Sequence, residues 1–141
     1  MDYDRIAYVD GACCSPNPGG PGGWGVHMLV GSDTIDRCGH LEAVPEMTNN
    51  VAEYHAALVA VALCIKDGFQ GSLLICADSQ LVVQQMKGNW TVKKGAYVPT
   101  YQKLKMLVDA APFSITWNWI PREQNQEADA LSKKGLNKVS I

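Results

Sequence analysis

The sequence has no long hydrophobic run and no basic leader, and these two absences limit where the protein can act. The uncharged apolar run at residues 54–65 is too short to cross a bilayer. Met1 is followed by Asp2 and Asp4, so the chain begins without the positive charge of a secretory leader. We therefore expect a soluble, unexported protein that acts in the cytoplasm and has no membrane partner.

The sequence also lacks the cysteine pattern of a disulfide framework or a zinc site. Its five cysteines are an odd number, Cys13 and Cys14 are adjacent, and no C-x-x-C pair occurs. A reducing compartment fits this usage best. Cys64 and Cys76 fall in apolar runs, and we expect both to be buried in the core.

Charged residues are few and unevenly distributed. They make up 18% of the 141 residues against 47% hydrophobic residues, which excludes a disordered chain and indicates a single domain over residues 1–141. Residues 1–78 carry ten acids and three bases, whereas residues 79–141 carry four acids and nine bases. The basic half contains a short segment in which lysines alternate with an aromatic residue, a composition typical of nucleic-acid surfaces. Its residues are Lys87, Trp90, Lys93 and Lys94. The alternative interpretation is that these lysines form the solvated face of ordinary helices and do not bind nucleic acid.

Hydrophobic periodicity predicts an α/β fold in which one mixed sheet is covered by helices. Alternating or continuous apolar runs predict strands at residues 6–10, 24–30, 35–41, 73–77 and 114–120. Helical spacing predicts helices at residues 51–65, 79–86, 99–110 and 125–134, the first of them with Asn50 as its N-cap. Short turns join the first three strands, so we expect these three to be antiparallel in a sheet of five strands.

Four carboxylates fall where this layout brings side chains together. Asp10 and Asp78 each follow a predicted strand, and ligands bind at the carboxyl ends of neighbouring strands in α/β sheets. Glu53 lies on the small-residue stripe of the first helix, which points it toward the sheet. Asp129 shares a helix face with Asn125, one turn before it. The sequence therefore predicts an acidic cluster at one end of the sheet.

Each carboxylate has a plainer explanation when taken alone. Glu53 follows Asn50 by three residues and would complete a capping box. Asp129 would favour its helix N-terminus and pair with Lys133 at i+4. Asp10 and Asp78 would serve as turn formers that accept hydrogen bonds from nearby amides.

A cluster of the four requires cations. At an effective dielectric constant near 20, two like charges about 4 Å apart repel by on the order of 4 kcal/mol. Oxygen ligands without His or Cys suit Mg²⁺, with Mn²⁺ as a substitute, rather than Zn²⁺. Two such ions would activate a water molecule and stabilise the leaving oxygen of a phosphodiester.

Five motifs occur in an order that resembles type 1 ribonuclease H. They are Tyr8-Val9-Asp10-Gly11, the glycine-rich loop at residues 17–25, Thr48-Asn49-Asn50-Val51-Ala52-Glu53, Asp78-Ser79-Gln80, and residues 121–129. The resemblance implies a ribonuclease H-like fold and hydrolysis of the RNA strand of an RNA–DNA hybrid to 5′-phosphate and 3′-hydroxyl ends. It also implies that Asp10, Glu53, Asp78 and Asp129 are the catalytic, metal-binding carboxylates.

The same resemblance implies a set of substrate contacts that share short polar side chains or positive charge. Amides would reach 2′-hydroxyl groups in the minor groove, and Thr48 would bind a phosphate of the DNA strand. The residues concerned are Cys13, Asn17, Thr48, Asn49, Asn50, Ser79, Gln80, Arg122 and Asn125. Turn and cap chemistry is the alternative for the asparagines.

The chain departs from the better-known members in three respects. The interval between Asp78 and Asp129 is too short for their basic protrusion, so Lys87, Trp90, Lys93 and Lys94 would form a reduced hybrid grip. No His lies in the loop before Asp129, where Arg122 stands instead. We expect no separate hybrid-binding domain before the first strand.

Two other interpretations remain open. Integrases, transposases and junction resolvases share carboxylates at strand ends but lack the T-N-N-x-A-E helix start found here. The D-E-D-D exonucleases usually place D-x-E in the first strand, whereas Asp10 is followed here by Gly11 and Ala12. A catalytically weak ribonuclease H-like module that only binds nucleic acid would keep the shape without the activity. Double-stranded RNA is a further substrate in some lineages, and a monomer is the expected state for this size.

Overall fold

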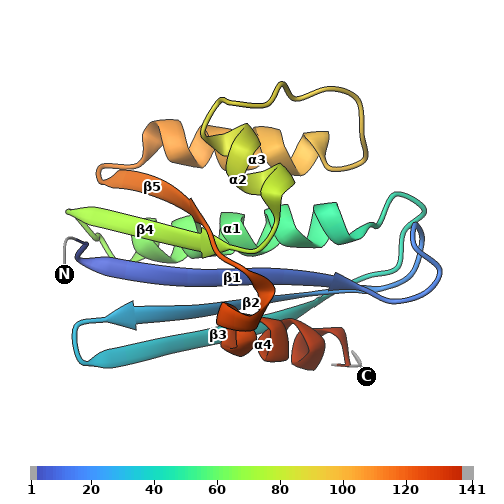
Figure 1. The fold of residues 1–141 in the computed structure, drawn as a ribbon, viewed down its shortest axis with the longest axis horizontal. Coiled ribbons are helices and arrows are strands. Elements are labelled where there is room, and N and C mark those ends of the chain that lie inside the picture. The colour runs from blue at the N-terminus through green and yellow to red at the C-terminus, as the bar shows by residue number, and fades with distance from the viewer. Residues whose placement is uncertain (1–2, 138–141) are drawn as a thin grey trace.

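The computed structural model describes residues 3–137, which form one mixed five-stranded sheet with helices on both faces (Figure 1). The ends of the expected domain, residues 1–2 and 138–141, lie outside the described residues. The elements are β1 (Arg5–Cys13), β2 (Gly22–Val30), β3 (Asp33–Leu41), α1 (Asn49–Lys66), β4 (Ser72–Ala77), α2 (Gln80–Met86), α3 (Val98–Ala110), β5 (Ser114–Trp119), the 3₁₀ turn η1 (Arg122–Gln124) and α4 (Gln126–Leu136). This order confirms the predicted fold class.

The sheet has the strand order β3-β2-β1-β4-β5. β1, β2 and β3 are antiparallel neighbours, and β1, β4 and β5 are parallel. β1 extends three residues beyond its predicted end, because Gly11, Ala12 and Cys13 pair with Trp24, Gly23 and Gly22 of β2, and it begins one residue earlier, at Arg5. β1 therefore continues past the end of β4, and the last residues of the glycine-rich loop, 22–25, belong to β2.

The start of α1 differs from the prediction. Thr48, not Asn50, is the N-cap: its backbone is extended (φ −140°, ψ 169°), and its side chain accepts a hydrogen bond from the Val51 amide at 3.2 Å. Asn50 lies inside the first turn of the helix. A capping box requires the Glu three residues after the N-cap, whereas Glu53 lies five residues after Thr48. The capping-box interpretation of Glu53 is therefore wrong, because the helix begins two residues earlier.

The main core lies between one face of the sheet and the helices α1, α2 and α3. Small residues of α1 let it approach the sheet closely, and Tyr54 is fully buried with its hydroxyl donating to Gln85 Oε1 at 2.5 Å. Cys64 and Cys76 are both buried, as predicted, and the five cysteines are free thiols. No helix among residues 3–137 has the length and apolar character needed to traverse a bilayer.

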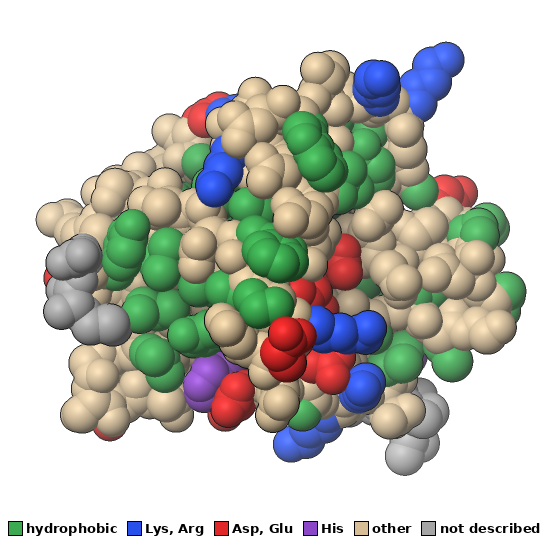
Figure 2. Space-filling view, in the orientation of Figure 1, with side chains coloured by type: hydrophobic (Ala, Val, Ile, Leu, Met, Phe, Trp, Pro, Cys, Tyr) green, Lys and Arg blue, Asp and Glu red, His purple; other side chains and the backbone are tan. Residues whose placement is uncertain are grey.

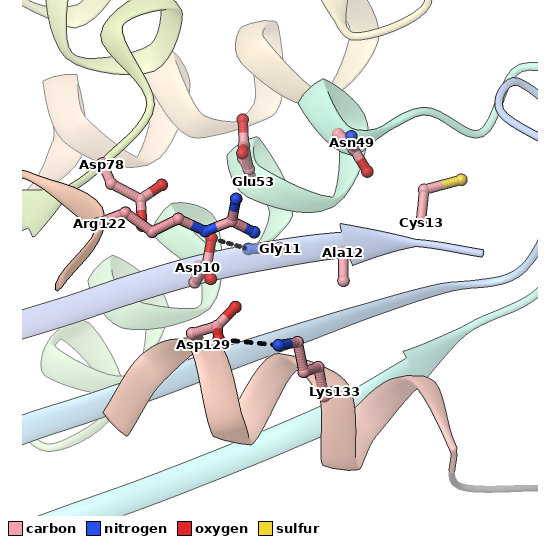
Figure 3. A pocket seen from close by; sticks show the side chains of 10 residues that line it. All are labelled: Asp10, Gly11, Ala12, Cys13, Asn49, Glu53, Asp78, Arg122, Asp129 and Lys133. Atoms are coloured by element: carbon pink, nitrogen blue, oxygen red, sulfur yellow. Dashed lines mark hydrogen bonds and ion pairs between the residues drawn. The ribbon is translucent and has the colours of Figure 1, made fainter. Parts of the chain in front are cut away.

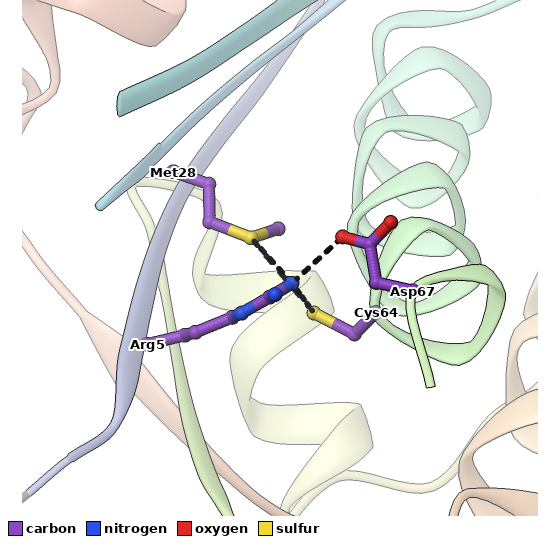
Figure 4. Close-up of polar contacts among 4 residues, drawn as sticks. All are labelled: Arg5, Met28, Cys64 and Asp67. Atoms are coloured by element: carbon purple, nitrogen blue, oxygen red, sulfur yellow. Dashed lines mark hydrogen bonds and ion pairs between the residues drawn. The ribbon is translucent and has the colours of Figure 1, made fainter. Parts of the chain in front are cut away.

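Arg5 closes this core at the end of β1 that is remote from Asp10. Its guanidinium group lies 3.1 Å from Asp67 Oδ2, 3.6 Å from Cys64 Sγ and 3.8 Å from Met28 Sδ (Figure 4). The same group stacks over the Phe69 ring, 4.6 Å from its centroid. With its charge satisfied by Asp67 and the Phe69 ring, Arg5 joins the start of β1 to the end of α1.

Candidate active site

The pairing of β1 with β4 places Asp10 and Asp78 side by side. The two strands are parallel neighbours in which Val9 pairs with Ala77, so the next residue of each is an aspartate. Asp10 is only 6% exposed, and its Oδ1 accepts a hydrogen bond from the Gly11 amide at 2.9 Å. The two carboxylates meet as predicted, but Asp10 lies inside β1 and not at its end, because the strand continues to Cys13.

Gly11 brings the third carboxylate into place. A Cβ at this position would lie 2.3 Å from Ala52 C and 2.3 Å from Glu53 N, so only glycine lets the backbone of α1 rest on β1. The Glu53 side chain consequently reaches the strand end from above the sheet. Carboxylate oxygens of Asp10, Glu53 and Asp78 all lie within 4.8 Å of one another.

Asp129 approaches from the other face of the sheet, on α4. Gly25 pairs with Asp10, and a Cβ at Gly25 would meet the α4 backbone at Ala128 O, 2.6 Å away. Paired residues point to the same face, so α4 lies on the face that carries Asp10. Asp129 forms an ion pair with Lys133, 3.1 Å between Oδ2 and Nζ (Figure 3), which confirms the predicted i+4 contact.

A pocket of about 440 Å³ joins these groups. On the face drawn in Figure 2, acidic side chains gather in a hollow with basic side chains beside them. The pocket is lined by Asp10, Gly11, Ala12, Cys13, Asn49, Glu53, Asp78, Arg122, Asp129 and Lys133. All four predicted carboxylates therefore open into one cavity, and no histidine is among its lining residues.

Burial and mutual repulsion hold two of the carboxyl groups partly protonated. Burial, the charge of Asp78 and a hydrogen bond with Asp129 raise the pKa of Asp10 from 3.8 to about 8. Burial raises the pKa of Glu53 from 4.5 to about 7, although Ser79 and Arg122 act in the opposite direction. The bare cluster thus favours neutral carboxyl groups at neutral pH, and a bound cation would favour the charged forms.

Asp129 shows the opposite behaviour. Its partial burial would raise the pKa, but hydrogen bonds with Lys133 and Asp10 together with the charges of Lys133 and Arg122 outweigh that effect and lower it. The pKa of Asp129 thus shifts in the direction opposite to that of Asp10. Asp129 stays ionised because a cation of the protein already neutralises it.

Asn125 does not occupy the position that a substrate contact requires. It is fully buried, and its Nδ2 donates to Val9 O at 2.9 Å and to Asp78 Oδ2 at 3.1 Å, while its Oδ1 has no hydrogen-bond partner. The predicted contact with substrate is therefore wrong, because no surface of Asn125 is available. The side chain instead fixes Asp78 against β1.

Of the other predicted contacts, some line the pocket and some do not. Cys13, Asn49 and Arg122 line it. Thr48 and Ser79 are the N-caps of α1 and α2, and each hydroxyl accepts a backbone hydrogen bond. Asn17 is exposed in the glycine-rich loop, Asn50 is half-buried, and Gln80 is exposed at the start of α2.

The residues of the predicted hybrid grip do not line the pocket. Lys87, Lys93 and Lys94 are exposed in residues 87–97, here called the basic segment, which connects α2 to α3. Trp90 in this segment is 48% exposed. None of the four side chains lines the pocket, so their role remains a prediction.

Two residues near the carboxylates were missed by the sequence-based prediction of the site. Lys133 lines the pocket; the sequence predicts its contact with Asp129 but not its place in the site. Trp119 donates its indole N–H to the Asp78 carbonyl at 3.1 Å. Nothing in the spacing of Trp119 from Asp78 predicts that contact, since β4 and β5 pair across 41 residues of sequence.

The sequence matches the family described as "Reverse transcriptase-like" over residues 8–135. A protein of Alcanivorax borkumensis named Ribonuclease H is 33% identical over 95% of this chain and 92% of its own length. The bifunctional protein Rv2228c of Mycobacterium tuberculosis is 32% identical over 86% of this chain, and the match spans 32% of that longer protein. The solved structure of LC11-RNase H1 in complex with an RNA/DNA hybrid has a TM-score of 0.83 at 27% identity and covers 94% of this chain and 96% of that one.

Proposed function

The chain belongs to the ribonuclease H family, and from this premise we propose that it is an endonuclease that hydrolyses the RNA strand of RNA–DNA hybrids. The single observation that carries the proposal is the convergence of Asp10, Glu53 and Asp78 within 4.8 Å in the pocket, with Asp129 on its rim. Water would add to the phosphorus atom and the bond to the 3′ oxygen would break, leaving 5′-phosphate and 3′-hydroxyl ends.

The residues of the pocket fit divalent cations. The donors are carboxylate oxygens, the kind that Mg²⁺ and Mn²⁺ prefer. Burial first, and then the charge of Asp78, raises the pKa of Asp10 and Glu53, and a bound cation would favour their charged forms. We propose that Asp10, Glu53, Asp78 and Asp129 hold two Mg²⁺ ions, with Mn²⁺ as a substitute. Such ions would activate the attacking water and stabilise the leaving oxygen.

The cationic side chains of the pocket have a separate task. Arg122 is exposed at the rim, and its charge lowers the pKa of both Glu53 and Asp129. A guanidinium group stays protonated, so Arg122 would contact the scissile phosphate or the product and would not act as a base. No histidine is among the residues that line the pocket, and Arg122 is the residue of the 121–125 turn that lines it. Arg122 is therefore the side chain of this turn that is available to contact the phosphate.

Recognition of RNA is assigned to the short polar groups around the pocket. Asn17, Asn49, Asn50 and Gln80 would contact 2′-hydroxyl groups and base edges in the minor groove. Thr48 would bind a phosphate of the DNA strand, and Cys13 and Ser79 would lie against the RNA backbone. These groups donate and accept hydrogen bonds without requiring a sequence.

The wider setting completes the proposal. Residues 1–141 would form one catalytic domain that acts as a monomer, and its five free thiols fit the reducing cytoplasm. The basic segment would add a small number of phosphate contacts. Double-stranded RNA is included as a second substrate to be tested.

The test compares one labelled RNA strand in three forms: paired with DNA, paired with RNA, and single-stranded. We expect metal-dependent cuts in the hybrid, with products that a 3′-end ligation assay identifies as 3′-hydroxyl and a 5′-phosphate-dependent exonuclease identifies as 5′-phosphate. Equal cutting of single-stranded RNA would contradict hybrid recognition. Hybrid binding by the folded protein without any cleavage would instead support the catalytically weak binding module.

A further inference from the structure

Asp129 differs from the other three carboxylates because a lysine of the protein already holds it. Lys133 Nζ lies 3.1 Å from Asp129 Oδ2, and the dashed contact in Figure 3 shows the ammonium group on the pocket side of α4. Among the described residues no Lys or Arg forms an ion pair with Asp10, Glu53 or Asp78. The pocket thus contains three carboxylates free for a cation and a fourth that is occupied.

The formal charges of the pocket indicate what this contact does. Four carboxylates face Arg122 and Lys133, so the lining carries a net charge of −2 when every group is ionised. One divalent cation balances that charge. A second divalent cation would leave an excess of +2 while Lys133 remains in place, and it would have to compete with the ammonium group for Asp129.

We propose that Lys133 is a positioning residue that occupies the place of the second divalent cation, so that this cation binds only by displacing it from Asp129. The inference rests on the proposed function, in which Asp129 takes part in cation binding. The free protein therefore binds one cation tightly and the other weakly. Entry of a hybrid phosphate adds negative charge to the pocket and favours the exchange of Lys133 for the second cation.

The position of Lys133 permits such an exchange. Its side chain is 62% exposed, whereas the Asp129 side chain is 25% exposed, so the ammonium group can leave without disturbing the core. An i, i+4 pair on a helix surface forms and breaks by side-chain rotation alone. The stem of Lys133 stays anchored on α4, so the released charge remains beside the pocket.

The test counts Mn²⁺ ions bound to the metal-free protein, without nucleic acid, by the electron paramagnetic resonance signal of free Mn²⁺. Four proteins are compared: the wild type, Lys133→Met, Lys133→Arg, and the matched control Lys134→Met. Lys134 is exposed, carries the same charge one residue later, and does not line the pocket. Its replacement therefore measures the effect of net charge alone.

We expect one tight and one weak class of site in the wild type. Lys133→Met should tighten the weak class about five-fold, as removal of a partly exposed ion pair implies, and shift the tight class no more than the control does. Lys133→Arg should bind as the wild type because it restores the pair. A Lys133→Met titration equal to that of Lys134→Met, equal tightening of both classes, or one class of site in every variant would each overturn the inference. Hybrid cleavage by the wild type judges the proposed function separately.

Discussion

Replacing Asp10 by Asn should stabilise the metal-free protein while it removes a cation ligand. Asn keeps the size of the side chain and an acceptor for the Gly11 amide, 2.9 Å away in the wild type. It removes a carboxyl group whose folded pKa of about 8 lies above the ordinary value of 3.8. A group whose pKa is raised by folding contributes its full stability below about pH 4 and loses it as the pH rises through about 8. The gain from Asp10→Asn should therefore grow over this interval.

The pKa of Asp10 gives the size of the effect. Each pH unit between 3.8 and about 8 corresponds to about 1.4 kcal/mol, which sets an upper bound of roughly 6 kcal/mol on the cost of ionising Asp10. Part of this cost is shared with Glu53 and Asp78, whose repulsion Asp10→Asn also relieves. We expect a gain of about 2–4 kcal/mol at pH 8, or about 10 °C in Tm, and a gain near zero at pH 4.

Urea unfolding in EDTA, followed by circular dichroism from pH 4 to pH 9, measures this difference. Glu123→Gln is the control, since Glu123 is an exposed acid of the 121–125 turn that does not line the pocket. Saturating Mg²⁺ should cancel the advantage of the variant, because binding stabilises only the protein that retains the ligand. An equal gain at pH 4 and pH 8, or no gain at pH 8, would refute the account of a repulsive carboxylate cluster.

Four further changes test other parts of the site. Gly11→Ala places a Cβ 2.3 Å from the α1 backbone, and we expect urea melts to show a loss of about 1–3 kcal/mol and cleavage to fall with it; a neutral variant would contradict the close approach of α1 to β1. Asn125→Ala removes the donor to Asp78 Oδ2, so stability should fall by about 1–3 kcal/mol and Mg²⁺ affinity should weaken. Arg122→Ala should lower the hybrid cleavage rate; unchanged turnover and unchanged affinity would remove its assigned role. Changing the three lysines of the basic segment to Gln should reduce the slope of log affinity against log salt by about one for each phosphate that these lysines no longer neutralise.

The order of elements was predictable because each signal lies within a short window of sequence. The apolar run at residues 73–77 and the alternation at 114–120 identify β4 and β5, and turn residues separate the first three strands. The first residue of α1 was not predictable, because Thr48, Asn49 and Asn50 are all residue types that cap helices. Only the extended backbone of Thr48 distinguishes the cap from the first turn.

The site was predictable at the level of its carboxylates and less so at the level of their support. Strand ends and helix stripes bring Asp10, Glu53 and Asp78 together with no knowledge of distances. The burial of Asn125 depends on how α4 rests on the sheet, which a local pattern does not describe. The close approach at Gly11 likewise depends on a helix that begins 38 residues later.

The most direct test of the central claim is the time course of RNA-strand cleavage in a labelled RNA–DNA hybrid with excess protein. Wild type and Glu123→Gln should cleave in Mg²⁺ and stop in EDTA, and Asp10→Asn, folded and at least as stable, should not cleave. That result would assign the chemistry to the carboxylate pocket. Cleavage by Asp10→Asn at the wild-type rate, or cleavage by the wild type in EDTA, would contradict it.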